Sequence, residues 1–175
     1  MKIAQEEVRR VTGKKLKRNE NDISEMEYLK YVIKETLRLH PPLPLMVPRE
    51  STTTTTVKGY HVPSKLRVFI NACAIQRDPN IWKNPEEFIP ERFGNNFIDI
   101  KGQDYEYIPF GSGRRGCRGL SFGIAVAELV LANLLCWFDW EFPGGAEEEL
   151  DMTEAFGLTV NKKTPLHLVP VSNSF

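Results

Sequence analysis

Two stretches of the chain place apolar residues at the spacing of a helix. Between residues 29 and 37, apolar side chains recur at i, i+3 and i+4, which predicts a helix with one buried face. The preceding run Ser24-Glu25-Met26-Glu27 fits a capping box. The second stretch, Leu120 to Phe138, is almost continuously apolar and is nearly long enough to span a membrane. Glu128 lies near its middle and would be costly in lipid, so we expect a buried core helix.

Shorter patterns elsewhere indicate loops and small strands. The prolines between residues 41 and 48 stop the first helix and predict an extended path after it. Residues 1–18 are expected to form the end of a charged helix followed by a basic linker. Runs of β-prone residues separated by turn residues predict a small meander and, near the C-terminus, a hairpin. The segments expected to form these strands are 52–57, 60–62, 66–74, 138–142, 153–160 and 166–169.

Length and charge restrict the possible functions only broadly. The chain has 175 residues, a size that is usually one domain. Its 23 Lys and Arg balance its 23 Asp and Glu, so no overall positive field predicts a nucleic-acid partner. The three cysteines lie far apart without a C-x-x-C pair, which predicts neither a zinc site nor a disulfide framework and suits a reducing compartment.

The chemistry of the chain is concentrated in one loop, Pro109 to Gly119. It contains four glycines, three arginines and Cys117, and it directly precedes the long apolar helix. Glycines at this density indicate a backbone that turns where side chains would clash. The unpaired amides and positive dipole end of the following helix favour a thiolate.

Four interpretations of Cys117 follow from these residues. The first is a structural cysteine, which is common for a free thiol. The second is nucleotide binding, because residues 111–116 match G-x-G-x-x-G, although that motif needs a strand directly before it and Pro109 stands there. The third is a cysteine nucleophile, which needs a histidine partner that the sequence does not place. The fourth is an axial thiolate ligand of haem iron, with glycines that let the chain approach the porphyrin and an arginine for a propionate.

A family resemblance supports the fourth interpretation. The run F-G-S-G-R-R-G-C-R-G fits F-x-x-G-x-R-x-C-x-G, the haem-binding signature of the cytochrome P-450 monooxygenases. Residues 34–42 resemble the family's K-E-T-L-R-x-x-P segment, and residues 77–93 resemble its R-D-P…W…P-E-x-F-x-P-E-R-F block. The resemblance covers essentially the whole chain and is most similar to the plant microsomal branch of specialised metabolism.

The resemblance implies an α+β, mainly α, fold: residues 1–175 would be the C-terminal part of a single cytochrome P-450 domain. In it, Cys117 would be the axial ligand and Arg115 and Arg49 would hold the propionates. A buried triad would be structural and needed for haem incorporation. The implied haem-binding residues are Cys117, Arg115, Arg49, Phe110, Gly111, Gly113 and Gly119; the triad is Glu35, Arg38 and Arg92; the substrate-pocket candidates are Leu45, Met46, Val47, Phe156, Gly157 and Leu158.

The implied activity is that of a haem-thiolate monooxygenase. It would insert one oxygen atom from O2 into a small apolar metabolite, with electrons from an NADPH-dependent flavoprotein reductase, at the cytosolic face of the endoplasmic reticulum membrane. The family's N-terminal anchor and its oxygen-activating central helix are not found in this chain, so no catalytic residue is assigned. Two alternatives remain, namely a truncated, inactive haem-binding chain and a nucleotide-binding dehydrogenase fragment.

One departure from the family pattern is Arg118, where the family usually has a small residue or proline. We expect Arg118→Pro to be tolerated for haem binding.

Overall fold

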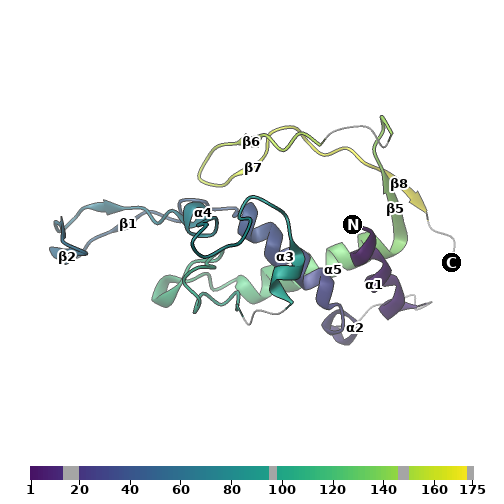
Figure 1. Cartoon of the computed structure of the whole chain (residues 1–175), viewed down its shortest axis with the longest axis horizontal. Helices are drawn as coiled ribbons and strands as arrows, with labels where there is room; N and C mark the ends of the chain where they lie inside the picture. The colour runs from purple at the N-terminus through teal and green to yellow at the C-terminus, as the bar shows by residue number, and fades with distance from the viewer. Residues whose placement is uncertain (14–19, 95–97, 146–149, 173–175) are drawn as a thin grey trace.

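The computed structural model describes residues 1–13, 20–94, 98–145 and 150–172. Three helices form its centre: α1 (Lys2–Thr12), α3 (Glu27–Leu39) and α5 (Leu120–Trp137). Figure 1 shows α3 and α5 crossing there, with the strands β1 to β3 extending to one side and the strands β5 to β8 to another. The expected linker and the last residues of the 1–18 segment lie outside the described residues.

Short elements connect the three central helices and form small antiparallel ladders. The short helices are α2 (Glu20–Ser24), α4 (Ala72–Ile75), η1 (Pro90–Phe93) and η2 (Gly113–Arg115). The strands are β1 (Arg49–Glu50), β2 (Thr55–Val57), β3 (Tyr60–Val62), β4 (Arg67–Val68), β5 (Phe138–Glu141), β6 (Glu154–Ala155), β7 (Asn161–Lys162) and β8 (Val169–Ser172). They pair as β1 with β4, β2 with β3, β5 with β8 and β6 with β7.

The predicted meander is correct in its first hairpin and wrong after it. Strands β2 and β3 pair across Lys58 and Gly59, both of which have positive φ, as a tight hairpin turn requires. The expected strand over residues 66–74 shrinks to β4, and β4 pairs with β1 instead of β3. The chain then enters α4 because the Asn71 side chain accepts a hydrogen bond from the Ala74 N–H (2.9 Å) and caps that helix.

The predicted C-terminal hairpin is wrong in its pairing. Strand β6 pairs with β7, while β8 pairs with β5 directly after α5. The Asp151 carboxylate explains where the inner hairpin closes, since it accepts hydrogen bonds from the Thr153 N–H and hydroxyl and from the Thr164 hydroxyl (2.8 Å). This link closes the chain on itself around β6 and β7 and leaves the later residues free to pair with β5.

The start of α3 also differs from the prediction. The helix begins at Glu27, with Met26 at the N-cap and no side-chain capping bond, so the capping box from Ser24 is wrong. The carboxylate of Glu7 on α1 takes that role. It accepts the N–H groups of Tyr28 and Leu29 at 3.0 Å each, two of the donors that a helix start leaves unpaired.

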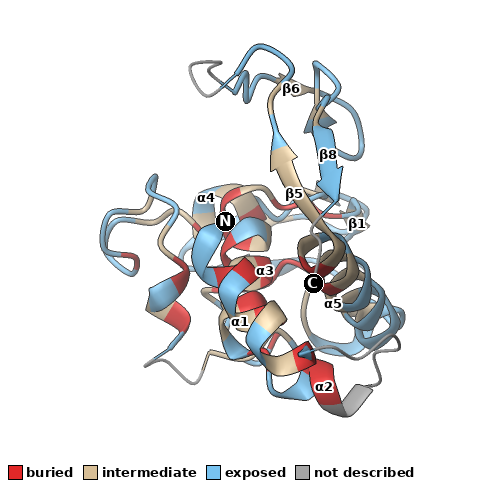
Figure 2. Ribbon diagram, turned by 90° about the vertical axis from the view of Figure 1, so that its right-hand side faces the viewer, coloured by how far each residue is buried: buried red, intermediate tan, exposed pale blue. Residues whose placement is uncertain are grey.

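The main apolar cluster lies where α1, α3 and α5 meet (Figure 2). It includes Val8 of α1, Leu29 of α3 and Cys136 of α5, all fully buried. The expectation that α5 is a buried core helix is wrong for the described residues, of which only Ala132 and Cys136 are buried in that helix. The reason is geometric, because α1 and α3 cover only one of its sides. An outward apolar stripe stays exposed, formed by Phe122, Val126, Leu129, Val130 and Leu134.

The length and apolar composition of α5 would suffice for a membrane span, with a mean hydropathy of 1.9 over 18 residues. Glu128 is half-buried near its middle, and burial raises the pKa of this carboxyl although the charge of Lys30 opposes the shift. Since the packed side of α5 belongs to the core formed with α1 and α3, the helix is an integral part of this fold.

Candidate functional site

A buried carboxylate lies between two arginines beside the glycine-rich loop. Glu35 and Arg38 share one face of α3, and Arg92 comes from η1. Arg38 donates from Nε and Nη2 to the two oxygens of Glu35 at 2.8 and 2.9 Å, and Arg92 Nε donates to Oε1 at 3.1 Å. Glu35 and Arg38 are fully buried. The structure therefore brings the three residues of the expected triad into one ionic cluster.

The protonation of Glu35 follows from these neighbours. Burial on its own raises the pKa of this carboxyl. Hydrogen bonds from Arg38 and from the Ile89 N–H (2.9 Å), together with the charges of Arg38 and Arg92, outweigh burial and hold the pKa below its ordinary value. The carboxylate thus stays charged, and both guanidiniums are compensated where water is excluded.

An aromatic cluster packs against the guanidinium groups of the two arginines. The Trp82 ring lies 5.3 Å from the guanidinium carbon of Arg38 and 5.9 Å from that of Arg92. Phe93 and Tyr107 pack against Trp82, and all three rings are buried. The Tyr107 hydroxyl donates to the carbonyl of Lys34 on α3 at 2.9 Å. The segment that leads into the glycine-rich loop is therefore anchored directly on α3.

The loop itself is a bend that ends at α5. Gly111 and Gly113 have φ of 74° and 67°, values that disfavour side chains, and η2 follows at residues 113–115. The Cys117 N–H donates to the Phe110 carbonyl at 2.9 Å, which closes the bend. Cys117 is exposed, and a Cβ at Gly119, the N-cap of α5, would lie 3.9 Å from its sulfur. The structure therefore presents a thiol outward just before the start of a long helix.

This geometry argues against the nucleotide-binding interpretation. That fold requires a strand directly before G-x-G-x-x-G and a helix that opens within the motif. Residues 101–110 here are turns and irregular chain, and the motif continues into a single 3-10 turn. The long helix begins only at Leu120, after the cysteine. The motif therefore lacks the structural context that would make it a phosphate-binding loop.

Two arginines from distant parts of the chain meet beside the loop. The pairing of β1 with β4 places Arg49, whose Nη2 donates to the Arg115 carbonyl at 3.3 Å. A hollow of about 560 Å³ lies here, and its lining is Pro48, Arg49, Glu50, Thr52, Arg114 and Arg115. Three guanidinium groups around one hollow suit an anionic group.

Comparison with known proteins identifies the family of the chain. Residues 1–169 match the family model described as Cytochrome P450. The chain belongs to the cytochrome P450 family. The chain is 62% identical over 170 residues to "Cytochrome P450 71A1" of Persea americana, covering 97% of this chain and 34% of that relative. It is 56% identical over 177 residues to a phenylacetaldehyde oxime monooxygenase of Prunus mume, covering 99% of this chain and 34% of that relative.

A solved structure extends the similarity to the fold. The structure titled "Zebra fish cytochrome P450 another structure with Abiraterone" matches with a TM-score of 0.86 at 27% identity, covering 99% of this chain and 39% of that one. The chain spans about a third of the length of the curated cytochrome P450 relatives. The expected fold, the C-terminal portion of a cytochrome P450, is thereby confirmed.

The six residues expected at a substrate pocket lie in two segments of the cytochrome P450 chain. Leu45, Val47, Phe156 and Leu158 are exposed. Met46 is buried with Ala72 and Ile108, and its backbone is left-handed (φ 53°). Gly157 lies between β6 and β7 with Phe156 and Leu158. One hydrogen bond, from the Val160 N–H to the Pro42 carbonyl (2.9 Å), joins the segments that carry the two groups.

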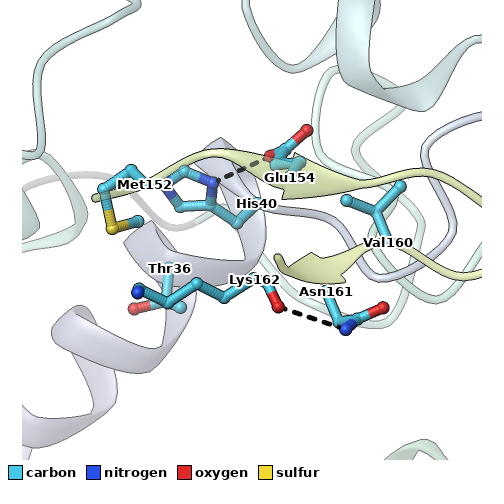
Figure 3. Close-up of a pocket in the computed structure, with 7 residues that line it drawn as sticks. All are labelled: Thr36, His40, Met152, Glu154, Val160, Asn161 and Lys162. Carbon is cyan, nitrogen blue, oxygen red and sulfur yellow. Dashed lines mark hydrogen bonds and ion pairs between the residues drawn. The ribbon is translucent and has the colours of Figure 1, made fainter. Parts of the chain in front are cut away.

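A separate cavity of about 190 Å³ lies between the end of α3 and the β6–β7 hairpin (Figure 3). His40 Nδ1 lies 3.3 Å from Glu154 Oε1 across it. The lining is Thr36, His40, Met152, Glu154, Val160, Asn161 and Lys162, which includes none of the expected site residues. His40 is thus engaged with the hairpin in this structure and lends no support to a cysteine–histidine pair.

Sequence analysis missed two residues that hold the loop in place. A Cβ at Gly102 (φ 74°) would lie 2.3 Å from the Gly111 carbonyl oxygen, and the Ser112 hydroxyl donates to the Gly102 carbonyl at 2.5 Å. Gln76 is fully buried and accepts a hydrogen bond from the Ile108 N–H at 2.9 Å. Gly102 precedes the loop closely in sequence and offered a glycine as a signal, whereas Gln76 is 32 residues from its partner Ile108 and offered none.

Proposed function

We propose that Cys117 is the axial thiolate ligand of a haem and that the protein carrying this chain is a haem-thiolate monooxygenase. The observation that carries the proposal is an exposed thiol in a positive-φ glycine bend at the start of a helix, inside a cytochrome P450 fold. When bound, the haem supplies the O2 and electron chemistry, and thiolate ligation favours O–O cleavage.

The residues around Cys117 fit such a group. A thiolate is a soft ligand suited to iron, and two glycines with positive φ leave the face of the bend free of side chains. Arg49 and Arg115 line the hollow beside it and match the charge of propionates. Phe110 contributes the carbonyl that holds the Cys117 amide and an aromatic ring that packs toward Gly123, where a Cβ would lie 4.0 Å away. This ring would limit water on the sulfur side and so tune the ligand.

The ionic triad has a supporting role in this proposal. Glu35, Arg38 and Arg92 take no part in the chemistry and fix the segment from Trp82 to Tyr107 that leads into the loop. By holding this segment in place, the triad orients the loop for haem incorporation. By mass action, bound haem would then add to the stability of the fold.

The wider activity rests on family membership. We propose hydroxylation of a small apolar metabolite, with O2 as cosubstrate and an NADPH-dependent flavoprotein reductase as electron donor, at the endoplasmic reticulum membrane. Leu45, Val47 and the Phe156–Leu158 segment remain the candidates for substrate contact in this chain. The named reaction of the Prunus mume relative, an oxime monooxygenase, belongs to the same reaction class.

A second candidate for the function is that the chain by itself neither binds haem stably nor catalyses turnover. The exposed apolar stripe of α5 favours it, because a sizeable apolar surface on a core helix calls for a covering segment. The coverage of about a third of each relative is consistent with this candidate. It predicts that the chain alone gives no stable haem complex, whereas the same chain joined to the rest of a relative does.

The test uses a fusion protein in which this chain replaces the matching C-terminal third of the Persea americana relative. The reduced fusion protein should show the red-shifted Soret band under carbon monoxide. Cys117→Ser should abolish that band while circular dichroism stays unchanged. Cys73→Ser is the matched control, since Cys73 is a half-buried thiol of α4, and this variant should keep the band. A red-shifted band that survives in Cys117→Ser would overturn the ligand assignment.

A further inference from the structure

Gln76 is a fully buried polar residue that the haem-binding motif does not include. It lies at the C-cap of α4, one residue before Arg77. Its side-chain amide makes three hydrogen bonds: two as donor to α3 and one as acceptor from the segment before the cysteine loop. No apolar residue of similar shape could make these bonds, so the position requires a polar side chain.

On one side, Gln76 completes the end of α3. A helix leaves its last carbonyls without intrahelical partners. Gln76 Nε2 donates to the Leu37 carbonyl at 3.0 Å and to the Arg38 carbonyl at 3.1 Å, and Arg77 Nη2 donates to the Leu39 carbonyl. In return, Arg38 Nη1 donates to the Gln76 carbonyl at 2.9 Å. Gln76 is therefore fixed to the helix turn that carries the Glu35–Arg38 pair.

On the other side, Gln76 holds the base of the cysteine loop. Its Oε1 accepts from the Ile108 N–H at 2.9 Å, and both groups are buried. The Ile108 carbonyl then accepts from the Gly111 N–H at 2.9 Å, and the Phe110 carbonyl accepts from the Cys117 N–H at 2.9 Å. Hydrogen bonds thus continue from the ionic triad through Gln76 into the bend that presents the sulfur.

We propose that Gln76 is a positioning residue for the ligand sulfur: it fixes the Cys117 loop to α3 and so sets the place from which the sulfur reaches iron. This inference rests on the proposed function, because it concerns the state of the axial ligand. The contact acts through the backbone of Ile108 and not through the haem. Loss of the bond would leave the buried Ile108 N–H unpaired, and the loop would gain freedom to settle with a displaced sulfur.

The substitution Gln76→Met tests the bond at nearly constant volume. Measured in the fusion protein, it should shift the ratio of the red-shifted to the unshifted carbon-monoxide Soret band by about tenfold toward the unshifted form. Amide exchange at Ile108 should accelerate in the same variant. Gln76→Glu should restore most of the red-shifted band, because its carboxyl keeps an acceptor oxygen for the Ile108 N–H.

Gln5→Met is the matched control. Gln5 is also buried and donates to the Phe138 carbonyl (2.9 Å) and to Asp139 (3.0 Å), but it joins α1 to β5, away from the loop. It should lower the unfolding temperature comparably and leave the Soret ratio unchanged. An unaltered ratio in folded Gln76→Met, an equal loss in Gln5→Met, or no recovery in Gln76→Glu would overturn the proposal.

Two further outcomes separate this inference from the proposed function. If the fusion protein with Gln76 intact shows no red-shifted band, the haem-thiolate assignment fails and the inference fails with it. If the band is present, only the variants decide about Gln76. Should Gln76→Met not fold, Gln76→Asn replaces it, because a side chain one methylene shorter cannot reach both α3 and Ile108. A full red-shifted band in folded Gln76→Asn would overturn the positioning role.

Discussion

Replacing Glu35 with glutamine is the most informative perturbation of this fold. The carboxylate accepts four hydrogen bonds, two from Arg38, one from Arg92 and one from the Ile89 N–H, at 2.8 to 3.1 Å. Glutamine keeps the size but removes the charge and turns an N–H2 group toward guanidinium donors. Arg38, which is fully buried, then becomes an uncompensated buried charge. Breaking such a pair costs about 3–5 kcal/mol, a large part of the stability of a typical domain.

The sign of the pH dependence follows from the lowered pKa of Glu35. The unfolded chain binds the proton at the ordinary carboxyl pKa, and the folded protein binds it only at lower pH. The stabilisation by the carboxylate is therefore complete above the ordinary pKa and is lost as the pH falls through the folded-state value. Glu35→Gln should remove this acid-side loss, so that wild type and variant converge at low pH.

The assay is urea unfolding of the fusion protein, followed by tryptophan fluorescence at neutral and acidic pH. Glu86→Gln is the matched control, since Glu86 forms a 3.5 Å pair with Arg77 in which its own side chain is 70% exposed. An exposed pair of this kind contributes about 0–1 kcal/mol. A neutral-pH loss in Glu35→Gln no larger than that of the control, or a difference from wild type that persists unchanged in acid, would refute the reasoning.

Three other substitutions have definite expected results. Gly102→Ala should destabilise the protein by more than the ~1–2 kcal/mol of a left-handed alanine, because its Cβ would also meet the Gly111 carbonyl at 2.3 Å. Urea unfolding measures this loss, and the control is Gly59→Ala, an exposed position where the added Cβ meets no atom within 4 Å. Tyr107→Phe should cost about 1 kcal/mol through the lost bond to Lys34 and should flatten the alkaline limb of the stability profile. Burial raises the pKa of Tyr107, so wild-type stability falls above the ordinary tyrosine pKa, where only the unfolded chain loses the proton; an unchanged alkaline limb would contradict this. Arg118→Pro should keep the haem spectrum of the fusion protein, since the Arg118 side chain is exposed and the closing bond of the bend uses the Cys117 amide; loss of the spectrum would count against it.

Local patterns predicted the three long helices, α1, α3 and α5, but neither the short helices nor the packing partners. The 29–37 periodicity and the apolar run after Gly119 correctly indicated α3 and α5, because both signals lie within a few turns of chain. The start of α3 was wrong because its cap comes from Glu7, about twenty positions earlier, and no local motif encodes such a contact. The prediction that α5 is buried was wrong because apolar composition shows which surface would gain from burial, but not whether another segment covers it.

In the candidate site, too, sequence motifs predicted some residues, while a residue that acts through tertiary contacts was missed. Spacing alone was enough to place Glu35 and Arg38 on one face, and the residues of the cysteine loop marked it before any family was considered. Family resemblance added Arg92 and the haem-ligand interpretation of Cys117. Gln76 escaped because a lone glutamine before R-D-P carries no periodic or motif signal. Its role is revealed by its tertiary contacts, namely the hydrogen bonds to the end of α3 and to the backbone of Ile108.

The cap that Glu7 provides for α3 couples the stability of two helices. A helix whose first turn is completed by its own sequence can form early and dock later. Here the donors of Tyr28 and Leu29 find their acceptor only when α1 is already alongside. The two helices therefore stabilise each other, so a substitution that loosens α1 also weakens the start of the helix to which the sulfur-bearing bend is tied.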